Sequence, residues 1–248
     1  MNLRGLLKFV SGNLERKTLL FILVPLIFLA YFGTLILACF GFSGTYDWRY
    51  RVISSLISPW NNPALHWIPS AGIAGTGLLM IPFAGYVKRR VRVASRLGAN
   101  IGAFAFGSGV IWLILAALIV SQHHHAKSVL PGLHEMCARS SALGLDTGML
   151  VFCSCAIKGY FIPVIGNKAF NLQLLVCWIL TTLPSIIVAL SACFLLATYA
   201  HFGWSAAVYH ALKNSVAWHL AFWEWVGSVA VFLFLLSSAL FLPKHAYE

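Results

Sequence analysis

One stretch of the chain places two carboxyl groups and a guanidinium on the same face of a helix. Glu135, Arg139 and Asp146 follow one another at intervals of four and seven residues, so at about 100° per residue they lie within about 40° of each other. An ionisable group at membrane depth costs about 2.5 to 3.5 kcal/mol on insertion scales. We therefore expect this stripe to face a bundle interior and to be paired, either as a functional site or as a structural ion pair that fixes the rotation of the helix.

Histidines accompany the carboxylates in two apolar runs. His134 precedes Glu135, and His219 stands five residues before Glu224, which we expect to pair with Arg139 or a histidine. Side chains of these types could bind zinc or act as general acid and base, but no HExxH or comparable motif is present. We therefore assign no catalytic residue, no metal site and no cofactor. The residues are predicted to form one polar interior cluster, which consists of His134, Glu135, Arg139, Asp146, His219 and Glu224.

The longest polar stretch, over residues 42–67, alternates charged and aromatic side chains. Asp47, Arg49 and Arg51 alternate with Trp48 and Tyr50. An arginine can bind a phosphate through two parallel hydrogen bonds, so this stretch is a candidate surface for lipid headgroups. The prolines and asparagines that follow predict a turn that returns the chain to the membrane.

Three consecutive histidines, His123, His124 and His125, follow the third apolar run. Adjacent side chains in a loop point in different directions, so the triplet does not by itself form a tridentate site. We interpret it as part of a solvated loop, with metal capture or pH sensing as the alternative.

The composition fixes the class of element that carries these residues. Of the 248 residues, 60% are hydrophobic and only 9% are charged, with a mean hydropathy of +0.85, whereas a soluble domain carries about 25% charged residues. This excludes a large soluble catalytic domain. We predict an all-α, polytopic membrane helix bundle that forms a single domain over residues 1–248. Its six transmembrane helices are expected over residues 19–40, 67–87, 98–121, 136–157, 173–199 and 217–242.

The positive charges predict the orientation of the bundle. With the N-terminus inside, twelve Lys and Arg residues fall on one face and five on the other, so both termini are expected in the cytoplasm. The net charge of +11 is thereby explained by topology, and no nucleic-acid partner is expected. The run Lys88–Arg92 either serves topology alone or also binds anionic headgroups. Eight of the nine histidines and most tryptophans fall on or near the outer face.

Four short motifs resemble the Frag/DRAM/Sfk membrane superfamily, which includes the post-GPI-attachment lipid-remodelling factor and bacterial domains of unknown function. They are the element Tyr50-Arg51-Val52-Ile53-Ser54-Ser55, the basic loop after the second span, the pair His134-Glu135 with small residues up to Gly144, and Glu224. The resemblance implies six helices and a lipid-related role in the outer leaflet or lumen. The chain departs from the family in its histidine triplet and in lacking the loop cysteines of some eukaryotic members.

Three functions remain open from the sequence. The leading hypothesis is recognition, or assisted remodelling, of a lipid or lipid-linked headgroup from the outer face. The alternatives are a membrane-embedded lipid hydrolase or acyltransferase with a His/Glu site, although no GxSxG motif is present, and a proton-coupled transporter of small solutes that uses Asp146 and Glu224. Expected partners are membrane lipids, with a membrane protein or a second copy of the chain as further possibilities. The expected location is the plasma membrane or inner membrane rather than an organelle.

Overall fold

The computed structural model describes residues 3–119, 132–161, 169–199 and 215–243, and within these ranges the chain is helical and contains no strand. A short α1 precedes a continuous helix that runs from Arg16 to Phe40. The further elements are α5 (Ser54–Ile57), α6 (Trp67–Val91), α7 (Arg96–Leu118), α8 (Leu133–Phe161), α9 (Leu172–Tyr199), the single turn η3 (Val216–Trp218) and α11 (Leu220–Phe241), and α1 itself covers Leu3–Val10. The histidine triplet lies outside the described residues.

Five of these helices are long and apolar enough to cross a membrane, which fits a multi-pass membrane protein. They are the first long helix, α6, α7, α8 and α11. Four of the predicted spans are shorter than their helices, because regular structure continues beyond the apolar run: α6 extends to Val91 and so includes Lys88, Arg89 and Arg90. In α9, the described apolar stretch covers only Leu172–Ile187.

The first long helix contains two widened π turns. It is composed of α2 (Arg16–Thr18), the π turn η1 (Leu19–Leu23), α3 (Val24–Phe28), the π turn η2 (Leu29–Gly33) and α4 (Thr34–Phe40). Pro25 lies at the start of α3, where the missing N–H of proline favours a break in the regular ladder. After η2, the Thr34 hydroxyl is shared between the carbonyls of Ala30 (2.7 Å) and Tyr31 (3.0 Å). A π turn changes the angular position of every side chain that follows it.

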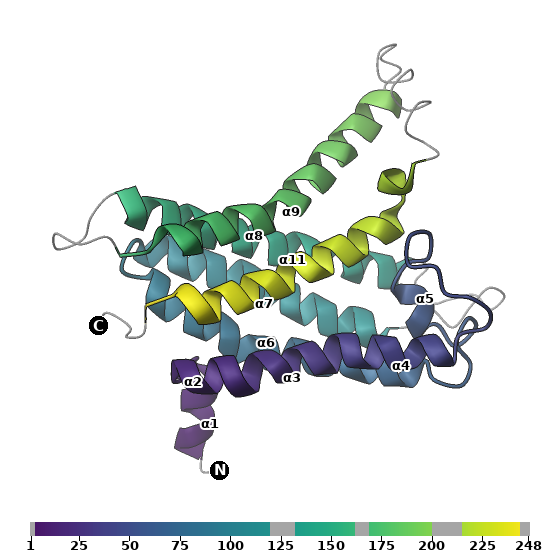
Figure 1. Cartoon of the computed structure of the whole chain (residues 1–248), viewed down its shortest axis with the longest axis horizontal. Coiled ribbons are helices and arrows are strands. Elements are labelled where there is room, and N and C mark those ends of the chain that lie inside the picture. The colour runs from purple at the N-terminus through teal and green to yellow at the C-terminus, as the bar shows by residue number, and fades with distance from the viewer. Residues whose placement is uncertain (1–2, 120–131, 162–168, 200–214, 244–248) are drawn as a thin grey trace.

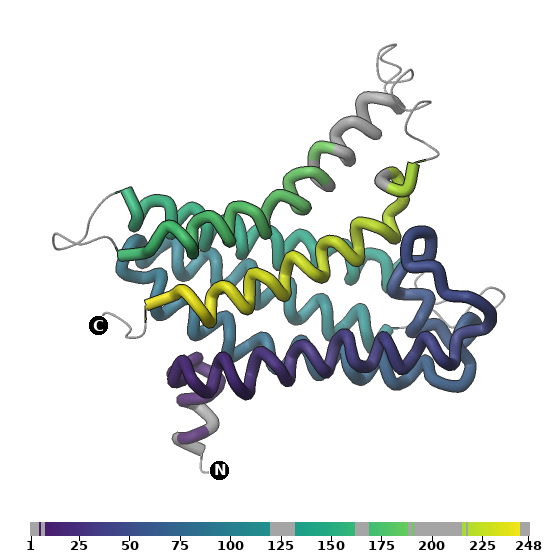
Figure 2. The backbone as a smooth tube through the Cα atoms, in the orientation of Figure 1, coloured from purple at the N-terminus to yellow at the C-terminus, as the bar shows by residue number. Residues whose placement is uncertain are grey.

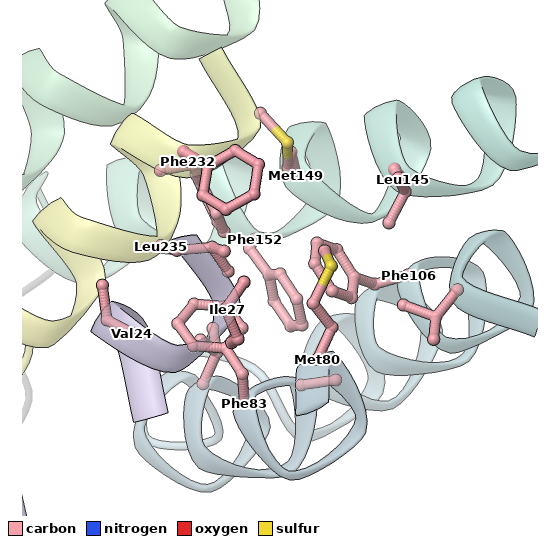
Figure 3. Close-up of a cluster of buried hydrophobic side chains, with 14 of the residues drawn as sticks. Val24, Ile27, Met80, Phe83, Phe106, Leu145, Met149, Phe152, Phe232 and Leu235 are labelled. Carbon is pink, nitrogen blue, oxygen red and sulfur yellow. The ribbon is translucent and has the colours of Figure 1, made fainter. Parts of the chain in front are cut away.

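Glycines allow α7 and α8 to approach each other closely. A Cβ on Gly144 of α8 would lie 2.6 Å from the Cα atom of Gly109 on α7, so the two backbones are in contact. Beside this crossing, fully buried aromatic side chains from several helices interlock (Figure 3). Phe83, Phe106 and Phe152 come from α6, α7 and α8, and none of their surface is exposed. These contacts join α6, α7 and α8 into one packed core.

The bundle has two ends (Figure 1), and the residues at these ends differ in charge. The first, which we call the loop end, contains segment 41–66, the start of α6, the end of α7 and the starts of α8 and α11. The second, the basic end, contains α1, the start of the first long helix, the ends of α6 and α8, the starts of α7 and α9 and the end of α11. The first long helix and α11 lie side by side and run in opposite directions between the two ends (Figure 2).

Candidate functional site

At the loop end, the carboxylate of Glu224 holds the segment that precedes α5. The backbone N–H of Ile53 donates a hydrogen bond to Glu224 Oε2 at 2.7 Å. Glu224 is half-buried in the second turn of α11, and Ile53 is buried with 7% of its surface exposed. Because a buried backbone N–H without an acceptor is costly, this contact fixes segment 41–66 against α11.

A chain of hydroxyl groups extends from the same turn of α11 into the bundle. Ser228 Oγ donates to the Glu224 carbonyl at 2.7 Å, and the Tyr31 hydroxyl lies 2.7 Å from Ser228 Oγ. Because the Ser228 proton is used on the carbonyl, Tyr31 is the donor to Ser228. Tyr31 belongs to η2, so the π turn aims this phenol at α11. The start of α11 is thereby tied to the first long helix as well as to the loop.

Tyr46 makes a second connection between segment 41–66 and α11. The indole Nε1 of Trp225 donates to the Tyr46 hydroxyl at 3.2 Å, and that hydroxyl donates to the Arg51 carbonyl at 2.9 Å. Burial raises the pKa of the Tyr46 phenol above its usual value, so the phenol is protonated at neutral pH and remains a donor. This fixes the backbone of Arg51 beside Trp225.

A row of aromatic rings runs from the Arg51 side chain to the first long helix. The Arg51 guanidinium lies 5.1 Å from the centroid of the Phe42 ring, which is in the range of a cation–π contact. Successive ring centroids then lie 5.3 Å apart for Phe42 and Tyr46, 6.4 Å for Tyr46 and Trp225, and 6.4 Å for Trp225 and Phe32. This row connects Arg51 to the turn of α11 that carries Glu224.

The outer part of the loop contains an ion pair of its own. Arg49 Nη2 lies 2.8 Å from Asp47 Oδ2, and the backbone N–H of Arg49 also donates to Asp47 Oδ1. Hydrogen bonds from Arg49 lower the pKa of the Asp47 carboxyl, and the same contact raises the pKa of the Arg49 guanidinium. Both side chains are partly exposed, at 34% and 51%. Nearby, the rings of Tyr50 and His219 meet edge to face at 4.9 Å.

A buried asparagine shapes the return of the loop to α6. Asn62 is fully buried, and its Nδ2 donates to the carbonyls of Ala38 and Leu56 at 3.0 Å each. Its Oδ1 accepts the backbone N–H of Leu65 at 3.2 Å. The side chain therefore satisfies groups at the end of α4, in α5 and before α6. This anchors α5, which begins directly after Ile53, to the end of α4 and the approach to α6.

Glu135 and Arg139 of the predicted α8 stripe form the expected ion pair, but the pair is exposed and does not face the bundle interior as predicted. Arg139 Nη2 lies 3.5 Å from Glu135 Oε2, and the two side chains are 81% and 70% exposed. Asp146, two turns further along, accepts a hydrogen bond from Ser185 of α9. His134 Nδ1 is shared between the carbonyls of Ala116 (2.9 Å) and Ile119 (3.1 Å) at the end of α7. His134 thus caps the C-terminus of a helix.

The residues predicted as one interior cluster therefore occupy separate places in the described structure. Glu135 pairs with Arg139, Asp146 contacts α9, His134 caps α7, and Glu224 contacts the loop. Among the described residues, no group of three His, Cys, Asp or Glu side chains could hold a metal ion.

Sequence reasoning did not predict the contacts that build the site around Glu224. Ser228 carries a signal, because it lies four residues after Glu224 and so on the same helix face. Tyr31 and Tyr46 carry none, and Ile53 stood out only as part of the element at residues 50–55, since each of the three meets α11 across more than 170 residues of sequence.

At the basic end, unlike the part of the loop end that the structure describes, arginine side chains bind backbone carbonyl groups of another segment. Arg16 Nε donates to the Ala239 carbonyl and Arg90 Nε to the Pro243 carbonyl, each at 2.9 Å. Arg90 is buried, with 4% of its surface exposed, and its guanidinium lies 3.4 Å from the centroid of the Tyr86 ring. These two arginines bind carbonyls at and just beyond the C-terminus of α11.

The loop end thus presents a carboxylate, a guanidinium and an aromatic row within one connected network. The chain was compared with protein-family models, with curated proteins and with solved structures, and none of them matches it.

Proposed function

We propose that the protein recognises a lipid or lipid-linked headgroup at the extracytoplasmic face, or assists its remodelling, and that the loop end is the site. The observation that carries this proposal is the hydrogen bond from Ile53 to Glu224. It holds the segment with Arg49 and Arg51 against the start of α11, at the end of the bundle that this proposal assigns to the outer headgroup region. Arg49 is already paired with Asp47, whereas the Arg51 guanidinium has no ion pair among the described residues and offers paired donors to a phosphate.

The orientation in this proposal is that of six spans with both termini in the cytoplasm, where α9 is the fifth span. The positive-inside rule supports it. Among the described residues, the loop end contains only three Lys or Arg residues (Arg49, Arg51 and Arg139), whereas the basic end contains ten, which are Arg4, Lys8, Arg16, Lys17, Lys88, Arg89, Arg90, Arg92, Arg96 and Lys158. Tryptophans at the loop end fit an interfacial belt; they are Trp48, Trp60, Trp67, Trp218, Trp223 and Trp225.

Membership of the Frag/DRAM/Sfk superfamily is part of the same proposal. Two of the motifs that carry the resemblance, the element at residues 50–55 and Glu224, meet through the contact between Ile53 and Glu224. A relationship to that superfamily would give a lipid-related role to this contact.

Proton-coupled transport is the second candidate, and one observation favours it. Asp146 lies within α8, and its carboxylate contacts Ser185 of α9. Ionisable groups inside membrane helices often mark proton pathways. The His/Glu enzyme has less support, because His134 Nδ1 is bonded to carbonyls of α7 and the His219 ring packs on Tyr50.

The proposal is tested by native mass spectrometry of protein purified in mild detergent, with the retained phospholipid counted per chain. The double variant Arg49→Gln/Arg51→Gln is expected to lose retained lipid by about tenfold, which corresponds to about 1.4 kcal/mol. The matched control Arg89→Gln/Arg92→Gln removes the same charge at the basic end and is expected to retain more lipid than the loop variant. Equal retention by the wild type and the loop variant would reject the loop end as the site.

A further inference from the structure

We infer that the headgroup bound at the loop end is zwitterionic, with its phosphate on Arg51 and its ammonium on Glu224. This inference rests on the proposed function and adds the chemical class of the ligand. It starts from the charges at the loop end and from which of them already have an opposite charge beside them.

Four of the loop-end charges are neutralised in two ion pairs between neighbours in sequence. Asp47 pairs with Arg49 at 2.8 Å, and Glu135 pairs with Arg139 at 3.5 Å. These are the ion pairs formed between described side chains, and neither includes Arg51 or Glu224. In the described part of the loop end, a guanidinium and a carboxylate therefore stand without an opposite charge.

The two unpaired charges belong to segments that are fastened together. The carbonyl of Arg51 is joined through the Tyr46 hydroxyl to Trp225, and two residues further on Ile53 donates to Glu224. Two connections therefore tie this short segment to α11: one joins the Arg51 backbone to Trp225, and the other joins Ile53 to Glu224. Arg51 lies two residues before the Ile53 N–H that Glu224 accepts, and the two side chains form no ion pair with each other, which leaves each of them available to a ligand.

Each of the two groups has free hydrogen-bonding capacity. The Arg51 guanidinium rests on the Phe42 ring, and its side chain is exposed, so its N–H groups can take a phosphate in the bidentate manner. Glu224 uses Oε2 on Ile53, and within the described residues Oε1 has no hydrogen bond. A half-buried carboxylate is costly unless it is paired, and an ammonium group would neutralise it.

The same arrangement discriminates against headgroups of a single sign. A purely anionic headgroup that binds Arg51 brings its negative charge close to Glu224, and like charges brought together in a partly dry site are unfavourable. A headgroup with phosphate and ammonium on neighbouring carbons places opposite charges beside both residues. Specificity would then come from Glu224 and overall affinity from Arg51.

The test compares phosphatidylethanolamine with phosphatidylglycerol of the same acyl chains, because only the first carries an ammonium group. Wild-type protein is titrated with each lipid in detergent, and bound lipid is counted by native mass spectrometry. We expect the wild type to prefer phosphatidylethanolamine by about tenfold. Glu224→Gln keeps an acceptor for Ile53 and is expected to reduce the preference to about onefold, whereas Arg51→Gln is expected to lower retention of both lipids.

The outcomes separate the inference from the proposed function. Retention that depends on Arg51 but shows no preference in the wild type, or a preference that survives in folded Glu224→Gln, would overturn the zwitterionic headgroup while the lipid site stands. Retention of both lipids that is indifferent to Arg51→Gln would overturn the site itself. The comparison of two lipids on the wild type needs no variant, so it decides the inference even if Glu224→Gln does not fold.

Discussion

At the basic end α11 is held by arginines from other helices, which donate to the carbonyls of Ala239 and Pro243. At the loop end α11 supplies the acceptor itself, through the Glu224 carboxylate that takes the N–H of Ile53. Both arrangements suit the helix dipole, which favours cations near the C-terminus and anions near the N-terminus. The two ends differ in the hydrogen-bonding groups that remain available to a ligand. The guanidinium of the buried Arg90 packs on Tyr86 and donates to carbonyls. Within the residues that the structure describes, Glu224 and Arg51 keep an acceptor and donors free.

This difference shows that a count of charges is a poor guide to function in a bundle of this kind. The basic end has most of the cations in the described chain, and at least two of them act as structural ties. The loop end has few charges, but there the fold leaves a cation and an anion without a counter-charge among the described residues. Four predictions test this difference between the two ends.

The largest effect is expected from Arg90→Met at the basic end. This change removes the hydrogen bond to Pro243 and the contact with the Tyr86 ring while keeping most of the side-chain volume. Loss of a buried, charge-assisted hydrogen bond predicts a decrease of about 3 kcal/mol in the free energy of unfolding in detergent. Arg92→Met, at an exposed position two residues on, is the control and is expected to change stability by less than about 0.5 kcal/mol. Equal effects would show that Arg90 is not a structural tie.

The next effect in size is expected at Glu224. Glu224→Ala leaves the Ile53 N–H without its acceptor and should lower the free energy of unfolding by about 2 kcal/mol. Glu224→Gln keeps an oxygen acceptor and should lower it by about 1 kcal/mol or less, because a neutral acceptor is weaker than a charged one. Chemical unfolding of both variants in the same detergent measures the difference. If both are as stable as the wild type, the carboxylate does not hold the loop.

A smaller effect is expected from removal of one hydroxyl group. Tyr46→Phe keeps the ring in the aromatic row but deletes the acceptor for Trp225 and the donor to Arg51. We expect a loss of about 1 kcal/mol in the free energy of unfolding and a change in tryptophan fluorescence at neutral pH. Tyr50→Phe is the matched control, since the Tyr50 contact with His219 is made by the ring. Identical behaviour of the two variants would remove Tyr46 from the network.

The smallest effect concerns the exposed pair of Asp47 and Arg49. Because Arg49 lowers the pKa of Asp47 in the folded protein, the pair contributes fully to the stability of the folded state at pH values above the ordinary pKa of an aspartate, about 3.9. Its contribution is lost as the pH falls through the lowered value. Carbon-13 NMR of the Asp47 carboxyl should therefore show a midpoint below that of an unperturbed aspartate. Arg49→Gln should return the midpoint to the ordinary range, and an unchanged midpoint would show that Arg49 does not cause the shift.

Much of the architecture was readable from the sequence, because long apolar runs predict membrane helices directly. The spacing of Glu135 and Arg139 correctly indicates that they share a helix face and form an ion pair. The spacing cannot say which way that face points, and in the described structure both side chains are exposed. Direction depends on how α8 packs on α7, and the contact of Gly144 with Gly109 fixes that packing.

The site around Glu224 was much less accessible to sequence reasoning. Glu224 stood out as an acidic residue in an apolar helix, but its partner is a backbone N–H, which every residue except proline carries. The contact of Tyr31 with Ser228 depends on the change in side-chain direction that the π turn η2 produces. No pattern in the sequence predicts a π turn. The sequence identifies Asn62 only as a turn residue, whereas in the structure it is fully buried and its side chain bonds three backbone groups.

The ties of α11 also bear on the order in which the protein is made. Arg16, Ile53 and Arg90 wait for partners that lie 223, 171 and 153 residues further along the chain. During synthesis the earlier helices emerge and enter the membrane while these groups still lack their final partners. The acceptors for all three groups arrive together with α11 and the residues that follow it. Insertion of α11 therefore completes the packing of helices that were synthesised before it. A chain interrupted before α11 would expose those unfilled contacts to the quality-control machinery of the cell.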